Sequence, residues 1–256
     1  MWIFLGIWLV NVVTFVAWRI CLALTNGLAA DFCGLNYDSG NKTLSYFIAG
    51  NLNQADTAFK FMEPEIKENC VFVQFSLKGW SAKATAKKIA HDLRWYHCRH
   101  ARIFTISLGD HVARYLEKEL GRIVEVYAVN PCPNRETLQK TWRKILCWAA
   151  PLAEIAMHGL GWLSILPIIP SFGGKYSLAL LIDQYWCIYY DHPPLGTSHT
   201  CGVICSTNDT FLDNSALEKT YLDAKIQYID TGHSDIVNNS ALYYRAICKL
   251  IRTAAP

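Results

Sequence analysis

Residues 103–120 read IFTISLGDHVARYLEKEL, and they join a short apolar run directly to an amphipathic segment. Residues 103–106 are apolar or β-branched, which is typical of a buried strand. Residues 111–120 carry apolar side chains at helical spacing among charged ones. Only Ser107, Leu108 and two further residues lie between the two. The segment therefore predicts a strand that turns sharply into a helix, with a hydroxyl group at the turn.

The same alternation of strand and helix continues along the chain. Helices of ten or more residues between strands indicate parallel pairing through right-handed crossovers, and apolar strands of this kind are buried on both faces. We therefore predict the α/β class, with a mostly parallel central sheet flanked by helices. The other predicted strands are residues 44–48, 70–77, 123–129, 202–205 and 226–229, and the other predicted helices include 55–69, 81–97 and 239–251.

The composition fits a folded domain of this class. Of the 256 residues, 52% are hydrophobic and 18% are charged, so the chain has ample material for a core and too few charges for a disordered protein. The net charge is +3, and no run of basic residues exceeds a pair such as Lys87 and Lys88. A basic stripe that follows phosphates is absent from the sequence, and we predict no nucleic-acid partner.

The ten cysteines lie mostly in apolar stretches, so we expect free thiols rather than a disulfide framework. His199, Cys201 and Cys205 invite comparison with a zinc site. Their spacing along a strand is unlike that of a paired-cysteine knuckle. We predict neither a metal ion nor an organic cofactor.

The amino terminus differs from the rest of the chain. Residues 2–18 hold no ionisable side chain, and as a helix they extend roughly 25 Å, close to the thickness of a bilayer core. Arg19 follows. We predict that residues 1–30 form a membrane anchor with a single N-terminal span. A cleaved secretion signal, which would give a secreted protein, is the alternative, because Ala29 and Ala30 suit a cleavage site.

Three predicted strands are followed by residues that suit nucleophilic catalysis. Ser107, Asp209 and His233 each lie just beyond a strand, and the carboxyl ends of parallel strands meet at one edge of a sheet, where ligands bind. A histidine can take the proton of a serine hydroxyl, and a carboxylate can hold the imidazole in the required tautomer. We expect these three side chains to meet. Asp213, one helical turn beyond Asp209, is the alternative acid.

The turn at residues 105–109 resembles the nucleophile elbow of the α/β-hydrolase superfamily, whose pattern is Gly-x-Ser-x-Gly. Gly109 fits this pattern, whereas Thr105 departs from it. The order of Ser107, Asp209 and His233 along the chain is also similar to the family order of nucleophile, acid and histidine. The resemblance extends over residues 44–251.

This resemblance implies an α/β-hydrolase-like domain over residues 36–256, with a variable insertion at residues 134–198. It also implies two backbone donors for the oxyanion of the reaction. The amide of Leu108 follows the nucleophile, and the loop after Gly50 is similar to the family's second donor site, which favours the amide of Asn51 or Leu52.

Residues 145–172 of the insertion are strongly apolar and hold few charges. In this family a segment at that point commonly caps the active site, so the resemblance implies an apolar lid and apolar acyl or ester small molecules as substrates. Contact of the same segment with a membrane interface is an equal alternative.

We therefore expect a membrane-bound serine hydrolase, a carboxylic-ester hydrolase or lipase-like enzyme that acts through an acyl-serine intermediate. A catalytically inactive, membrane-bound interaction protein of this fold is one alternative, suggested by Thr105. A peptidase or thioesterase with the same triad is another, because the preference for a leaving group depends on the shape of the pocket.

Overall fold

A seven-stranded sheet forms the centre of the protein, with strands in the order β1-β3-β2-β4-β5-β8-β9. β1 pairs antiparallel with β3, and every other neighbouring pair is parallel. The predicted mostly parallel sheet is thus confirmed. The computed structural model describes residues 1–33, 43–51, 55–59, 69–98, 100–120, 124–171, 174–191, 193, 200–236 and 238–254. The strands of the sheet are β1 (Asp31–Cys33), β2 (Thr43–Ile48), β3 (Cys70–Gln74), β4 (His100–Ile106), β5 (Val124–Val129), β8 (Thr200–Ser206) and β9 (Lys225–Ile229).

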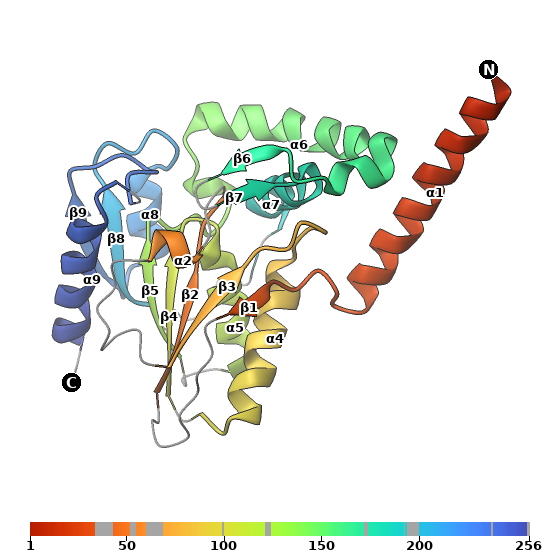
Figure 1. Cartoon of the computed structure of the whole chain (residues 1–256). Helices are drawn as coiled ribbons and strands as arrows, with labels where there is room; N and C mark the ends of the chain where they lie inside the picture. The colour runs from red at the N-terminus through yellow and green to blue at the C-terminus, as the bar shows by residue number, and fades with distance from the viewer. Residues whose placement is uncertain are drawn as a thin grey trace.

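Helices flank the sheet, as predicted, and others lie over one of its edges. Figure 1 shows α9 on the near side of the sheet and α5 on the far side, while α6 and α7 lie above the upper edge with the small strands β6 and β7. The helices are α1 (Trp2–Leu24), α2 (Ala55–Ala58), α4 (Ala82–Trp95), α5 (Gly109–Leu120), α6 (Lys140–Leu160), α7 (Leu178–Tyr190), α8 (Asn214–Thr220) and α9 (Ser240–Ala254). The short elements are η2 (Arg135–Thr137), η3 (Gly161–Ile165), β6 (Ile169–Ser171) and β7 (Gly174–Tyr176).

Two differences from the predicted elements concern the first part of the chain. The sheet begins at Asp31, ahead of the boundary predicted at residue 36, because a three-residue edge strand is too short to show an alternating pattern. The helix predicted over residues 55–69 is seen as α2, which ends at Ala58, and residues 60–68 lie outside the described residues.

Stacked aromatic rings hold the central strands in register. Phe47 on β2 stacks on Phe104 of β4 with ring centroids 4.9 Å apart, and both side chains are fully buried. Such pairs contribute about 1 kcal/mol beyond the area that they bury. The two phenylalanines are also register partners, so the next pair is Ile48 with Thr105. The end of β2 is thereby held beside the turn at Ser107.

The predicted insertion forms a cap over the carboxyl ends of the strands. It consists of η2, α6, η3, the antiparallel pair β6–β7, and α7. Figure 1 shows this cap between the sheet and the projecting helix α1. We call these elements the cap throughout.

From Trp8 onward, α1 packs against the cap. Phe15 is fully buried in a small cluster with Met157, Ala179 and Ile182, apart from the main core. The indole Nε1 of Trp8 donates to the carbonyl oxygen of Gly159 at 2.9 Å. Helix α1 is therefore a packed element as well as an apolar one.

Polar side chains on α1 extend this contact. Asn11 donates through Nδ2 to Leu160 O at 3.2 Å, and its Oδ1 accepts from the amide of Trp162 at 3.3 Å. The indole Nε1 of Trp162 donates to Thr14 Oγ1 at 3.1 Å. The two polar interruptions of the apolar sequence, Asn11 and Thr14, thus both bind the cap.

An ion pair joins the end of α1 to α7. Arg19 binds the carboxylate of Asp183, and its Nη1 donates to Lys78 O at 2.8 Å. The other carboxylate oxygen of Asp183 accepts from the amide of Trp80 at 2.7 Å. The side chains of Arg19 and Asp183 are only 12% and 13% exposed, so each needs the other as a partner.

Within the described residues, α1 is the one helix long and apolar enough to cross a membrane, with a mean hydropathy of 2.0. A signal sequence near the N-terminus has the same properties. The side chains of its first nine residues, Trp2 to Val10, are all exposed.

We predict that Arg19→Met lowers the free energy of unfolding by about 3 kcal/mol, because it leaves a largely buried carboxylate without its cation. The double variant Arg19→Met/Asp183→Asn should recover most of this loss, since the amide oxygen still accepts from Trp80. Thermal unfolding in detergent micelles measures both. Equal stability of Arg19→Met and the parent protein would contradict the role of the ion pair.

Candidate active site

The turn between β4 and α5 holds Ser107 in an unusual backbone conformation. Its φ is +48°, in the left-handed region that residues other than glycine adopt rarely and at a cost. Two hydrogen bonds fix it: Ser107 N donates to Val129 O at 2.9 Å, and Cys132 N donates to Ser107 O at 3.1 Å. The sharp turn predicted from residues 103–120 is therefore present.

Two glycines allow the close packing of this turn. A Cβ on Gly109 would lie 2.6 Å from the carbonyl oxygen of Ile48, and one on Gly50 would lie 2.9 Å from Ser107 Cβ. Thr105, which departs from the family pattern, is fully buried within β4. A β-branched residue at this position is therefore compatible with the left-handed serine.

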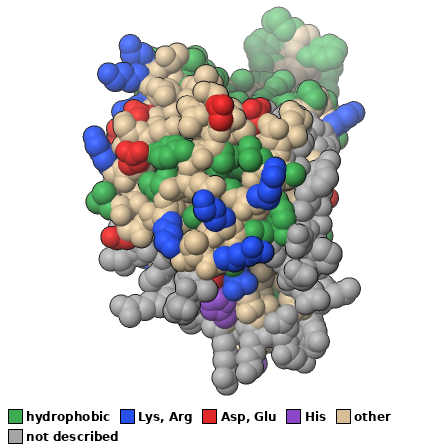
Figure 2. Space-filling view, turned by 90° about the vertical axis from the view of Figure 1, so that its left-hand side faces the viewer, with side chains coloured by type: hydrophobic (Ala, Val, Ile, Leu, Met, Phe, Trp, Pro, Cys, Tyr) green, Lys and Arg blue, Asp and Glu red, His purple; other side chains and the backbone are tan. Residues whose placement is uncertain are grey.

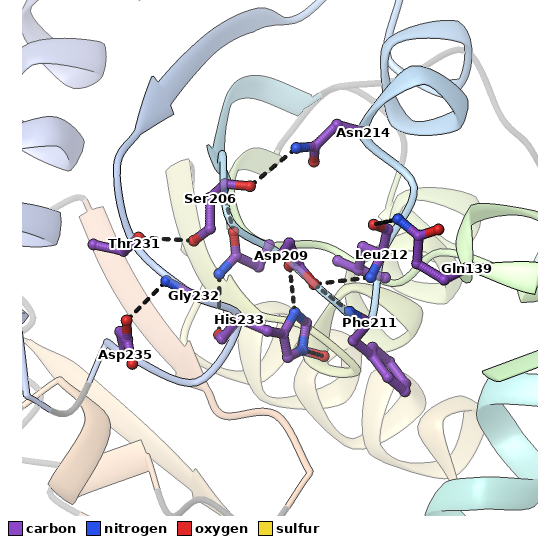
Figure 3. Close-up of polar contacts among 12 residues, drawn as sticks. Gln139, Ser206, Asp209, Phe211, Leu212, Asn214, Thr231, Gly232, His233 and Asp235 are labelled. Carbon is purple, nitrogen blue, oxygen red and sulfur yellow. Dashed lines mark hydrogen bonds and ion pairs between the residues drawn. The ribbon is translucent and has the colours of Figure 1, made fainter. Parts of the chain in front are cut away.

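The structure brings Ser107, Asp209 and His233 together, as Figure 3 shows for the last two. Ser107 Oγ lies 3.1 Å from His233 Nε2, and His233 Nδ1 lies 2.6 Å from Asp209 Oδ2. The other oxygen, Asp209 Oδ1, accepts from the amides of Phe211 and Leu212, both at 2.8 Å. The Asp209 side chain is 1% exposed, so water does not compete for these bonds.

Asp213, the alternative acid, lies elsewhere. Its side chain caps α8 and accepts from the amides of Ser215 and Ala216 at 3.0 and 3.3 Å. The hydrogen bond from the Ser215 hydroxyl, together with these amides, lowers the pKa of Asp213 below its ordinary value. This carboxylate serves as a helix cap, and the carboxylate that contacts His233 is that of Asp209.

A cavity of about 300 Å³ opens beside Ser107 and His233. The cap covers it with side chains from α6 and α7, and most of the lining is apolar. The lining residues are Asn51, Ile106, Ser107, Trp142, Leu146, Tyr185, Ile188, Thr210, Phe211, His233, Ser234 and Ile236.

Solved structures share this architecture at low sequence identity. A hydrolase from Oleispira antarctica matches with a TM-score of 0.63 and 11% identity, over 89% of this chain and 96% of its own. A thermophilic esterase from Thermogutta terrifontis gives 0.60 and 12%, over 89% and 94%. An N-acyl homoserine lactonase gives 0.58 and 12%, over 88% and 93%. The sequence matches no protein-family model and no curated protein.

This chain has the α/β-hydrolase fold.

Of the three backbone amides predicted as oxyanion donors, those of Leu108 and Asn51 belong to described residues. Among the described residues, the backbone amide of Leu108 donates no hydrogen bond, and it directly follows Ser107. Asn51 lines the cavity. Leu52 lies outside the described residues.

A polar network that the sequence does not reveal positions the histidine loop. Asn130 follows β5, donates through Nδ2 to His233 O at 3.1 Å and accepts from Ser206 N at 2.8 Å. The hydroxyls of Ser206, Thr231 and Tyr243 lie 2.8 to 2.9 Å from one another. The position of Asn130 directly after a buried strand was the available signal, because polar residues there lie at the ligand-binding edge.

Among the described residues, His111, Cys187 and Asp191 are a group whose atoms could hold a metal ion. Cys187 Sγ lies 3.4 Å from His111 Nδ1 and 3.6 Å from Asp191 Oδ2. Burial lowers the pKa of His111 to about 4 and raises that of the Cys187 thiol. All ten cysteines are free.

We predict that Gly109→Ala lowers stability by about 1–3 kcal/mol, because the new Cβ meets backbone that cannot move away cheaply. Gly159→Ala is the matched control: it lies in α6 with nothing within 4 Å of the new Cβ, and it should be neutral or stabilising by up to about 1 kcal/mol. Thermal unfolding of both variants tests this. If both behave alike, the close approach at Gly109 is not a constraint.

Proposed function

We propose that this protein hydrolyses carboxylic esters with apolar acyl groups through an acyl-serine intermediate, and that α1 attaches it to a membrane. The observation that carries the proposal is the chain of contacts from Ser107 Oγ through His233 to Asp209, which opens on a largely apolar cavity. This combination is what nucleophilic ester cleavage requires.

In the first half of the reaction, His233 Nε2 takes the hydroxyl proton while Ser107 Oγ bonds to the carbonyl carbon. The negative charge that develops on the carbonyl oxygen is met by the amide of Leu108, with a second donor from the segment at Asn51. The ester C–O bond then breaks, and the alcohol leaves with the proton held by His233. The acyl group remains on Ser107.

In the second half, a water molecule gives a proton to His233 and attacks the acyl carbon. The bond to Ser107 Oγ breaks, the serine recovers its proton from the imidazole, and the carboxylic acid leaves. Asp209 keeps the imidazole in the tautomer that presents Nε2 to Ser107, and its charge stabilises the imidazolium. The two backbone amides that bind Asp209 Oδ1 prevent its rotation.

The cavity lining supports an uncharged, apolar acyl group. Among the described residues that line it, none is Asp, Glu, Lys or Arg, and the cap contributes Trp142, Leu146 and Ile188. A charged substituent would lose its hydration there without a partner. A thioester or a peptide bond would enter the same chemistry, and the choice among them depends on the leaving group.

The packing of α1 supports a retained anchor over a cleaved signal. Cleavage near Ala30 would remove Phe15 from its cluster with Met157 and Ile182, and it would leave Asp183 without Arg19. Both losses are destabilising, because one exposes apolar surface and the other leaves a largely buried charge unpaired.

We predict that a fluorophosphonate probe labels the parent protein and that Ser107→Ala abolishes the labelling. Ser234→Ala is the matched control, since Ser234 lines the same cavity and should leave labelling intact. Asp209→Asn should reduce kcat by roughly 10⁴-fold at unchanged fold. A parent protein that resists the probe would instead favour the inactive interaction protein suggested by Thr105.

We predict that Leu146→Trp shifts the preference from octanoyl toward acetyl esters by roughly tenfold in the ratio of kcat/KM, because the larger side chain fills space that a long acyl group needs. Leu152→Trp is the control on the outer face of the same helix. A panel of chromogenic esters provides the measurement. An unchanged ratio in Leu146→Trp would place the acyl group outside this cavity.

A further inference from the structure

Helix α6 carries apolar residues on two faces, and the fold accounts for only one of them. Its inner face buries Leu146, Ala150 and Met157. Its outer face presents Trp148, Leu152 and Ile155, which are 75%, 65% and 70% exposed. Their spacing of four and three residues places them on one side of the helix. We call these three residues the outer stripe.

The exposed apolar surface continues beyond α6. Leu163 and Ile168, in and just after η3, are 59% and 68% exposed. Between residues 145 and 168 the sequence contains one carboxylate, Glu154, and no Lys or Arg. Exposed apolar surface of this extent marks an interaction site in a soluble environment or a surface in contact with lipid.

The position of α1 favours contact of this surface with lipid over contact with another protein. Trp8 and Asn11 bind the cap at Gly159 and Leu160, so six residues of α1, Trp2 to Ile7, lie beyond that contact. Six helical residues extend roughly 9 Å, about a third of a bilayer core of roughly 30 Å. Helix α1 therefore enters lipid to any greater depth only together with the cap.

The opposite end of the molecule has a different surface. Figure 2 shows basic and acidic side chains spread among smaller apolar areas on the face that includes α9 and β9, while hydrophobic side chains dominate the distant projection at the upper right. Lys225, Lys249 and Arg252 contribute to the charged face. Among the described residues, the exposed large apolar side chains lie mostly on α1 and the cap, and Trp95, Leu222 and Tyr228 are the exceptions.

We propose that the outer stripe lies in the acyl region of a phospholipid bilayer, in the same leaflet that α1 enters. This inference rests on the membrane attachment in the proposed function and not on ester hydrolysis. It replaces an isolated single span by a joint surface of α1 and the cap. Lys140 and Lys144, exposed at the start of α6, would lie at the level of the lipid head groups.

Tryptophan emission tests this placement without any assay of activity. The full chain is reconstituted in phosphatidylcholine vesicles with and without bromine on the acyl chains, which quenches tryptophans in contact with them. The contribution of Trp148 is the difference between the parent and Trp148→Phe. Trp95→Phe is the matched control, because Trp95 is 72% exposed at the end of α4, far from the cap (Figure 1).

Severalfold quenching of the Trp148 contribution, with none for Trp95, is the expected result. Equal and negligible quenching of both overturns the inference. Trp2→Phe tests the insertion of α1 into lipid separately from the placement of the cap. If Trp2 is quenched and Trp148 is not, α1 is in lipid and only the placement of the cap is wrong; if neither is quenched, the membrane attachment fails as well.

A second variant tests whether the apolar character of the stripe causes the contact. Leu152→Glu/Ile155→Glu should reduce the quenching of Trp148 severalfold, because two carboxylates oppose entry into the acyl region. Leu222→Glu is the control, at a residue 82% exposed between α8 and β9. Both variants change exposed side chains, and circular dichroism verifies their folds. Unchanged quenching in the double variant would overturn the inference.

Discussion

One close backbone approach determines the geometry of the candidate site. The start of α5 at Gly109 packs so tightly on the end of β2 that a Cβ there would lie 2.6 Å from Ile48 O. This contact leaves two residues for the turn from β4, and Ser107 takes the left-handed conformation as a result. The cost is of order 1–3 kcal/mol. Hydrogen bonds from Ser107 N to Val129 O and from Cys132 N to Ser107 O offset it.

The histidine is positioned by the strands rather than by its own loop. Asn130, at the end of β5, accepts from Ser206 at the end of β8 and donates to the carbonyl of His233. One side chain thus connects the edge of the sheet to the loop that carries His233. Because Ser107 also binds the end of β5, through Val129, the distance between Ser107 and His233 depends on strand register.

The sequence predicted what depends on local pattern and missed what depends on packing. Strands and the order of the three polar strand ends are visible locally, so Ser107 and His233 could be named in advance. The choice between Asp209 and Asp213 depends on which carboxylate receives which backbone amides, and no spacing rule decides it. Thr105 departs from the family motif, but the structure holds it as a fully buried residue of β4 directly before the left-handed turn. The role of Asn130 required the sheet to be assembled first.

The two apolar faces of α6 have a common explanation if the cap lies in lipid. Leu146 on the inner face lines the cavity. The outer stripe lies on the opposite side of the same helix, which is about 10 Å thick. Moving an acyl chain from lipid into water costs about 0.8 kcal/mol per methylene, or roughly 6 kcal/mol for eight carbons. A substrate that passes from the leaflet around α6 into the cavity avoids this cost. Helix α1 then sets the orientation of the cap as well as the location of the protein, because Trp8 and Asn11 bind the cap directly and Arg19 binds Asp183 of α7.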